Sequence, residues 1–272
     1  MTFASIMVSV DLASDAGART SIAAHLADAL DGRTIGVAAQ IPDHVTAQVG
    51  PMGASAFLPG LTERAVLDGL ARAKDLFRVA VGSRSRVSWR SAVEPGLAYL
   101  ASQARAADLI VVGQRNGSEA TGCIKPLDPA SVVLAAGRPV LVVPSGINYL
   151  EVRRVMVAWK DTREARRAVS DALPILRLAR RVDVVSVTGG DQTSGAADVA
   201  AYLSTHGIEA TSSEHRSEGT GDADTLLYLA SEHAYDLIVM GAYGHGRLRE
   251  MVLGGVTRDI LRRAPTCSLL SH

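Results

Sequence analysis

The sequence has few of the residues that mark secreted, metal-binding or nucleic-acid-binding proteins. Its two cysteines, Cys123 and Cys267, lie far apart and form neither a disulfide framework nor a metal-type cysteine pair. The 28 basic residues equal the 28 acidic residues, and each half of the chain is close to neutral. A bulk electrostatic partner, such as nucleic acid or an acidic membrane, is therefore not expected.

Long hydrophobic segments are also missing. The longest apolar runs, such as LIVV at 109–112 and VLVV at 140–143, are too short to span a bilayer. The N-terminal sequence, MTFASIMVSVDLASD, has no basic region ahead of a long apolar stretch, which a signal peptide requires. With 47% hydrophobic and 21% charged residues, the composition is that of a globular protein, and we expect a soluble cytoplasmic one.

What the sequence does contain is an internal repeat. YLAS at 99–102 precedes DLIVVG at 108–113, and YLAS at 228–231 precedes DLIVMG at 236–241. The period is far longer than the 20–50 residues of solenoid repeats, so the pattern indicates a duplicated domain.

Each half alternates short, almost wholly apolar strands with helical patterns. Such strands, joined by helices, indicate a parallel sheet that is covered on both faces. The sequence therefore predicts two tandem doubly wound, Rossmann-like α/β domains, residues 1–145 and 151–272, each with a five-stranded, mainly parallel sheet. The predicted strands are 4–10, 34–39, 86–91, 108–112, 139–143, 154–158, 182–187, 208–213, 236–240 and 266–270.

Two helices of the first half have a recognisable apolar face, spaced at three to four residues. The residues expected to be buried on these faces are Ile22, Leu26, Ala29 and Leu30 in one helix and Val66, Leu70, Ala73 and Phe77 in the other.

One Gly- and Pro-rich segment, residues 40–60, has no counterpart of matching length in the second half. We interpret it as a surface insertion, and a mobile lid or an oligomer contact is the alternative.

A spaced glycine pattern follows the fourth strand of the second half. Gly241 and Gly244 come at the carboxyl end of that strand, and GGVT at 254–257 then opens a helix. Glycines let backbone approach a ligand closely, and free N–H groups at a helix N-terminus favour phosphate. The Thr257 hydroxyl adds a potential donor. The order of glycines differs from a dinucleotide fingerprint, and a Walker loop would need a lysine after the glycine.

With this motif and the duplication, the chain resembles the universal stress protein family in its tandem two-domain form. ATP-binding members of that family carry G-x2-G-x9-G-[Ser/Thr], which here is Gly241-x2-Gly244-x9-Gly254-Gly255. The resemblance implies a bound ATP whose ribose and phosphates lie against the glycines and whose base lies near the ends of the first two strands; whether Mg²⁺ accompanies it stays open. The implied nucleotide-binding residues are Ala158, Lys160, Val187, Met240, Gly241, Gly244, His245, Gly254, Gly255, Val256 and Thr257.

The second half departs from the family pattern at two positions. Gly255 stands where the family has Ser or Thr, and Lys160 stands where it has an acidic residue, with Asp161 one place later. Lysine cannot accept hydrogen bonds from adenine or ribose. Asp161 and Glu164, at a helix start rich in arginine, are interpreted as capping charges, and Trp159 as a packing residue at the sheet end.

The first half is degraded in a complementary way. It keeps the acidic residue, Asp11, but Gly117 comes one place late after Gly113, and no Gly-Ser/Thr precedes the next helix. Asp128 and Pro129 are ordinary helix-start signals there. We therefore predict a partner domain without its own nucleotide.

The sequence contains no metal-ligand spacing and no catalytic residue set, so an enzyme is not the favoured class. The leading hypothesis is a stress-response regulatory protein that binds ATP in the C-terminal domain. A ligand-free dimeric scaffold and a slow ATP hydrolase are the alternatives. By resemblance, RPVLVV (138–143) and TCSLLSH (266–272) join the halves as an intrachain pseudo-dimer, and whether two chains also form a homodimer stays open.

Overall fold

The structure is a computed structural model of the chain. It describes residues 2–42, 46–49, 54–57, 59–115, 123–188, 194–217, 221–244 and 255–272.

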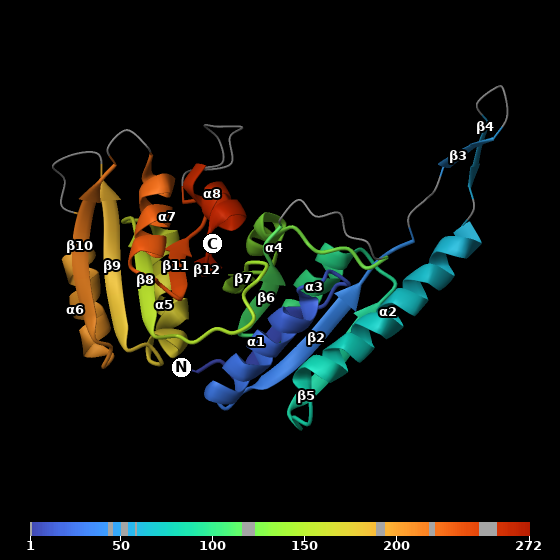
Figure 1. The fold of residues 1–272 in the computed structure, drawn as a ribbon, viewed down its shortest axis with the longest axis horizontal. Coiled ribbons are helices and arrows are strands. Elements are labelled where there is room, and N and C mark those ends of the chain that lie inside the picture. The colour runs from blue at the N-terminus through green and yellow to red at the C-terminus, as the bar shows by residue number, and fades with distance from the viewer. Residues whose placement is uncertain are drawn as a thin grey trace.

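One ten-stranded β-sheet runs through both halves of the molecule, and helices cover its two faces (Figure 1). The order of the strands is β10-β9-β8-β11-β12-β7-β6-β1-β2-β5. The strands are β1 (Ser5–Ser9), β2 (Arg33–Ala39), β5 (Val87–Ala92), β6 (Leu109–Gly113), β7 (Val140–Val143), β8 (Arg154–Trp159), β9 (Arg181–Thr188), β10 (Ala210–Arg216), β11 (Leu237–Gly241) and β12 (Cys267–Ser271).

Within each half, five strands run parallel in the spatial order 3-2-1-4-5 of a doubly wound fold. The predicted fold class is confirmed, and all ten predicted strands are present with ends that differ by at most three residues. The central strands are largely buried because helices pack on both of their faces: β6 is buried throughout, and β11 is buried except at its last residue, Gly241.

The helices divide between the two faces. Buried residues of α1, α2, α5 and α6 form one hydrophobic cluster with the sheet, and those of α3, α4, α7 and α8 form another on the opposite face. The helices are α1 (Ala16–Ala29), α2 (Pro59–Val81), α3 (Gly96–Gln103), α4 (Pro129–Ala135), α5 (Arg163–Leu176), α6 (Ala196–Thr205), α7 (Asp222–Glu232) and α8 (Gly255–Arg263), and a short 3₁₀ turn, η1 (Ala104–Ala106), follows α3.

The predicted apolar faces are largely confirmed. All four residues predicted for α2 are buried, and so are Ile22 and Leu26 of α1. The prediction for Ala29 was wrong: it is exposed, because α1 ends there and the chain turns away at Asp31, which has a positive φ of 54°. Leu30 is half-buried just beyond the helix.

The 40–60 segment contains a feature that the sequence did not suggest. Residues Thr46–Val49 (β3) and Ala54–Phe57 (β4) form a two-stranded antiparallel sheet of their own. Figure 1 shows this hairpin projecting away from the main sheet, beyond the start of α2. Its separate position agrees with an insertion on the surface, while a role as a lid or an oligomer contact stays untested.

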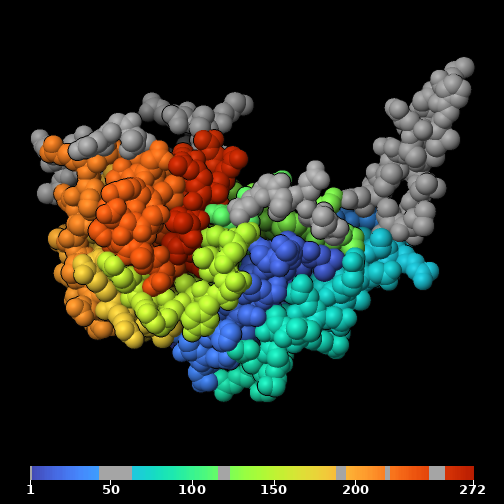
Figure 2. Space-filling view, viewed as in Figure 1, coloured from blue at the N-terminus to red at the C-terminus, as the bar shows by residue number. Residues whose placement is uncertain are grey.

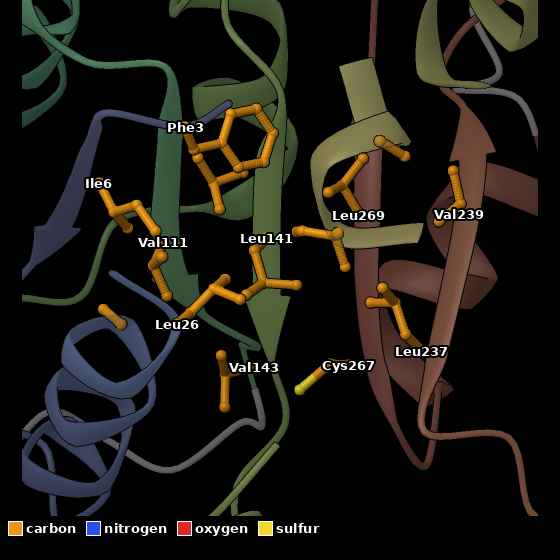
Figure 3. Close-up of a cluster of buried hydrophobic side chains, with 14 of the residues drawn as sticks. Phe3, Ile6, Leu26, Val111, Leu141, Val143, Leu237, Val239, Cys267 and Leu269 are labelled. Carbon is orange, nitrogen blue, oxygen red and sulfur yellow. The ribbon is translucent and has the colours of Figure 1, made fainter. Parts of the chain in front are cut away.

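The two halves are joined through their last strands. β12 pairs with β7 in an antiparallel register in which Leu269 faces Leu141, and this confirms the predicted intrachain pairing. Figure 3 shows Leu141, Val143, Cys267 and Leu269 gathered at this junction in one hydrophobic cluster. Figure 2 shows the connecting segment, 144–153 (yellow-green), on the surface where the two halves meet. A hydrogen bond from Gln114 Nε2 to the carbonyl of Ala264 also crosses between the halves.

We expect the Leu141–Leu269 pair to contribute strongly to the stability of the whole chain. Both side chains are fully buried, so Leu141→Ala should lower the free energy of unfolding by about 2–5 kcal/mol in a urea titration. The matched control is Leu67→Ala on α2, which is 52% exposed and should change it by no more than about 0.5 kcal/mol.

A double-mutant cycle with Leu269→Ala tests the contact itself. Because the two residues face each other across the junction, their effects should be coupled by about 0.5–3 kcal/mol. If the two changes in the free energy of unfolding simply add, the two side chains do not stabilise each other.

Candidate functional site

The second half offers a ligand-binding position where its strand order reverses. After β8 the chain passes to α5 on one face of the sheet, and after β11 it passes to α8 on the other. β8 and β11 are neighbours, so their carboxyl ends border the crevice in which doubly wound folds bind ligands.

The structure places the predicted apolar site residues on one face of the sheet. Met240 stands opposite Ala158 in the register of β11 and β8. Met240 belongs to the hydrophobic cluster on the α7/α8 face, and Ala158, Val187 and Val256 pack against that cluster. They provide the kind of apolar wall that a flat base needs. His245 and Gly254, two further predicted site residues, lie outside the described residues.

Gly241 and Gly244 have a close packing partner that sequence reasoning did not identify. A Cβ atom on Gly241 would collide with two backbone atoms of α5. These are Ala165 N and Glu164 C, and the latter would be only 2.6 Å away. A Cβ atom on Gly244 would lie 2.9 Å from Glu164 Oε2 and 3.1 Å from Thr162 Oγ1. Both glycines therefore let the first turn of α5 dock against the loop after β11. The contact joins positions about 80 residues apart, so no local sequence signal revealed it.

The first turn of α5 is capped and partly charged. The Thr162 hydroxyl oxygen accepts a hydrogen bond from the backbone N–H of Ala165 at 3.2 Å, which is N-cap geometry. Asp161 is exposed and forms an ion pair with Arg166 at 2.6 Å. This agrees with the interpretation of Asp161 as a capping charge.

Glu164 is also an acid of the first turn, as interpreted, but its side chain is buried, with only 3% exposed. Its Oε1 oxygen accepts a hydrogen bond from Arg163 Nε at 2.5 Å, while its Oε2 oxygen is buried without a hydrogen-bond partner among the described residues. Burial raises the pKa of Glu164, but hydrogen bonds from Arg163 and its own backbone N–H, the Arg163 charge and the Thr162 hydroxyl outweigh it and hold the pKa below its usual value. Glu164 is therefore a buried carboxylate at neutral pH.

The loop after β11 is tied to the start of α8. Tyr243 has a φ of 58°, a left-handed conformation that is strained for a bulky residue, and its backbone N–H donates to Thr257 Oγ1 at 3.4 Å. Thr257 is buried, and its hydroxyl oxygen is the acceptor in this hydrogen bond. Gly255 is the exposed first residue of α8, as predicted, and no described atom lies within 4 Å of the position of a Cβ there.

Lys160 follows β8 directly and is exposed. Trp159, one residue earlier, is buried, and its Nε1 donates to the carbonyl of Ser194 at 2.8 Å. The expected packing role of Trp159 is confirmed.

The corresponding crevice of the first half contains a buried ion pair. Arg19 of α1 and Asp11 after β1 are 1% and 2% exposed, and Arg19 Nη2 lies 2.6 Å from Asp11 Oδ2. The other oxygen of Asp11 accepts from the backbone N–H of Ala13 at 2.9 Å. Arg19 Nη1 occupies the space where a Cβ on Gly113 would lie. The acidic residue that the family resemblance assigns to a ligand is thus already satisfied by the protein itself.

A small cavity lies near this pair. Its volume is about 10 Å³, which is room for about one water molecule, and the carboxyl ends of β1 and β2 border it. Among its lining residues are Ser9, Val37, Ala39, Gly96, Ile124 and Leu127. The α4 start near it has the predicted cap: Asp128 Oδ2 accepts from Ser131 N at 3.0 Å, and Pro129 is the first helical residue. Gly117 lies outside the described residues.

In the parts of the chain that the structure describes, no group of three or more His, Cys, Asp or Glu side chains is placed to bind a metal ion. None of the described helices combines the length and the apolar character that crossing a membrane requires.

Comparisons with known proteins agree with this arrangement. The model of the universal stress protein family matches residues 151–270. A universal stress protein from Archaeoglobus fulgidus DSM 4304 superimposes with a TM-score of 0.71 at 14% identity, covering 98% of this chain and 95% of that one. A putative universal stress protein from Pseudomonas aeruginosa UCBPP-PA14 gives a TM-score of 0.57 at 15% identity, covering 99% and 93%.

A protein of unknown function from Pseudomonas aeruginosa PAO1 has the same fold, with a TM-score of 0.59 at 16% identity and coverage of 99% and 92%. No curated protein sequence gives a significant match. At these identities the solved structures establish the fold, and the family match covers the second half. The match to the universal stress protein family thus lies in the second half, and the chain shares its fold with these solved structures over nearly its whole length.

Proposed function

We propose that the chain is a stress-response regulatory protein whose second domain, residues 151–272, binds one adenine nucleotide, ATP. The first domain, residues 1–145, serves as its partner and binds none. The observation that carries the proposal is the meeting of two ligand-binding features beside the β8–β11 crevice. They are the Gly241–Gly244 loop, where backbone is open to a ligand, and the phosphate-favouring N-terminus of α8, and the Tyr243–Thr257 hydrogen bond joins them.

Each part of the nucleotide has a counterpart in this arrangement. The base lies against the apolar wall of Ala158, Val187 and Met240. The phosphates lie toward Gly255–Thr257, where the first N–H groups of α8 and its dipole favour negative charge. The exposed Lys160 adds positive charge at the same edge of the sheet. These groups bind and orient a ligand, so the proposal assigns regulation by occupancy to the site and no chemical step.

A single site per chain follows from the difference between the halves. In the first half, Arg19 and Asp11 satisfy each other in the crevice, and the adjoining cavity holds about one water molecule. Opening a site there would leave two buried charges without partners, which is costly.

Binding should be visible as stabilisation. At an ATP concentration one hundred times the dissociation constant, the free energy of unfolding should rise by about 2.7 kcal/mol, with one nucleotide bound per chain. Thermal unfolding with and without ATP, together with mass spectrometry of any nucleotide extracted from the purified protein, measures this. The proposal fails if no adenine nucleotide is recovered and ATP leaves the melting curve unchanged.

Gly255→Ser should strengthen ATP binding about tenfold. The added hydroxyl lies at the start of α8, where it can donate to a phosphate, and a hydrogen bond to a charged group contributes about 1.5 kcal/mol or more. Gly255→Ala is the matched control, because it adds the same Cβ into open space without a hydroxyl. Equal dissociation constants for the two variants, measured by titration calorimetry, would place the phosphates elsewhere.

Arg19→Met should destabilise the protein by about 3–5 kcal/mol, because it leaves Asp11 buried and ionised without its partner. Burial already raises the pKa of Asp11 against the opposing charge of Arg19, and removing Arg19 raises it further. The loss in free energy of unfolding should therefore be complete at pH values above the raised pKa of Asp11. It should become smaller as the pH falls through that pKa, because Asp11 is then neutral.

The control for this prediction is Arg86→Met, which removes an exposed ion pair with Asp31 and should cost at most about 1 kcal/mol. The double variant Asp11→Leu/Arg19→Met should recover most of the lost stability in urea titrations. A deficit for Arg19→Met that does not vary with pH would mean that Asp11 is not the group left unpaired.

A further inference from the structure

Glu164 has a buried oxygen atom that the folded chain leaves without a partner. The side chain is 3% exposed, and only Oε1 is used, by Arg163. Oε2 is fully buried and accepts no hydrogen bond within the described structure. Buried acceptors are nearly always satisfied in native proteins, so a charged one that is not satisfied points to a group that arrives from outside.

The position of this oxygen connects it with the proposed site. It lies under the loop after β11, 2.9 Å from where a Cβ on Gly244 would be, while the backbone of Gly244 itself is exposed. Thr162 is the neighbouring protein hydroxyl, and it helps to lower the pKa of Glu164. Its oxygen accepts from Ala165 N, but its position does not have the geometry of a hydrogen bond to Oε2. A donor that enters beside Gly244 therefore meets an acceptor that is already in place.

A carboxylate at this position excludes some parts of a nucleotide. A phosphate beside Oε2 would be repelled, because both groups are negatively charged. The base is expected against the α7/α8 face of the sheet, whereas Glu164 belongs to α5 on the opposite face. The remaining donors of a nucleotide are the ribose hydroxyls, and carboxylates bind these hydroxyls in other doubly wound folds.

Resting on the proposed function, we propose that Glu164 Oε2 accepts a hydrogen bond from a ribose hydroxyl and selects ribonucleotides over deoxyribonucleotides. The acid comes from the first turn of α5, four residues after the exposed Lys160. Glu164 is thus a specificity-determining residue of the second domain. In the ligand-free protein its orphaned oxygen is a local cost, which the ligand removes.

The test compares ATP with 2′-deoxy-ATP, 3′-deoxy-ATP and ITP on the full-length protein, by titration calorimetry. The wild type should bind at least one of the two deoxy forms about tenfold or more weakly than ATP, since a hydrogen bond to a charged acceptor is lost. Glu164→Gln should bind ATP more weakly and should bring the ATP-to-deoxy ratio close to one.

Asp161→Asn is the matched control, because it removes an acid from the same helix start that is exposed and paired with Arg166. It should keep both the ATP affinity and the ratio. A second readout separates binding from packing. In the wild type, ATP should raise the melting temperature more than the weakly bound deoxy form does, and Glu164→Gln should abolish this difference. A purely structural Glu164 would lower the ligand-free melting temperature and leave the difference unchanged.

The outcomes distinguish this inference from the function on which it rests. Failure of every nucleotide to bind overturns both. Tight ATP binding with equal affinities for the deoxy forms overturns the ribose contact and leaves the proposed function standing. If only ITP binds more weakly than ATP, the donor is the adenine amine. If Glu164→Gln weakens ATP and the deoxy forms equally, the effect of Glu164 on binding is general. Either result also overturns the ribose contact.

Discussion

The antiparallel pairing of β7 with β12 is the constraint on which the rest of the molecule depends. Without it, each half would expose an apolar strand at the edge of its sheet, which is the kind of edge that associates with other chains. With it, the two parallel sheets become one, and Leu141 and Leu269 enter a hydrophobic cluster shared by both halves. The duplication therefore produces a single folded body, with the chain acting as its own partner.

The two halves use equivalent glycines in different ways. In the second half, Gly241 allows the first turn of α5 to lie directly on the end of β11. In the first half, the space beside Gly113 is filled by the guanidinium of Arg19. The same backbone opening thus admits a helix end in one case and a side chain in the other. A glycine motif alone does not distinguish these uses, because each depends on what the facing helix presents.

The sequence was sufficient for the fold because its signals are local or repeated. Apolar runs such as LIVV and LIVM define buried strands wherever they occur, and their repetition defined the two halves.

The candidate site was only partly predictable. Its apolar wall and the start of α8 follow from strand ends and glycine spacing, but the burial of Glu164 depends on a loop some 80 residues away. The β3–β4 hairpin was missed because its two strands are only four residues long and lie within a segment whose glycines and prolines indicated a loop.

The antiparallel junction alone would direct the strand ends of the two halves toward opposite edges of the sheet. The sheet twists, however, by about 20–25° from one strand to the next, and five steps separate β8 from β1, which gives about 100–125° in all. This rotation undoes much of the reversal, so the arrowheads of β2 and β9 both point toward the upper side in Figure 1. The crevice with the satisfied ion pair and the crevice proposed for the nucleotide thus lie toward the same side of the molecule, although the strands that border them meet in an antiparallel junction.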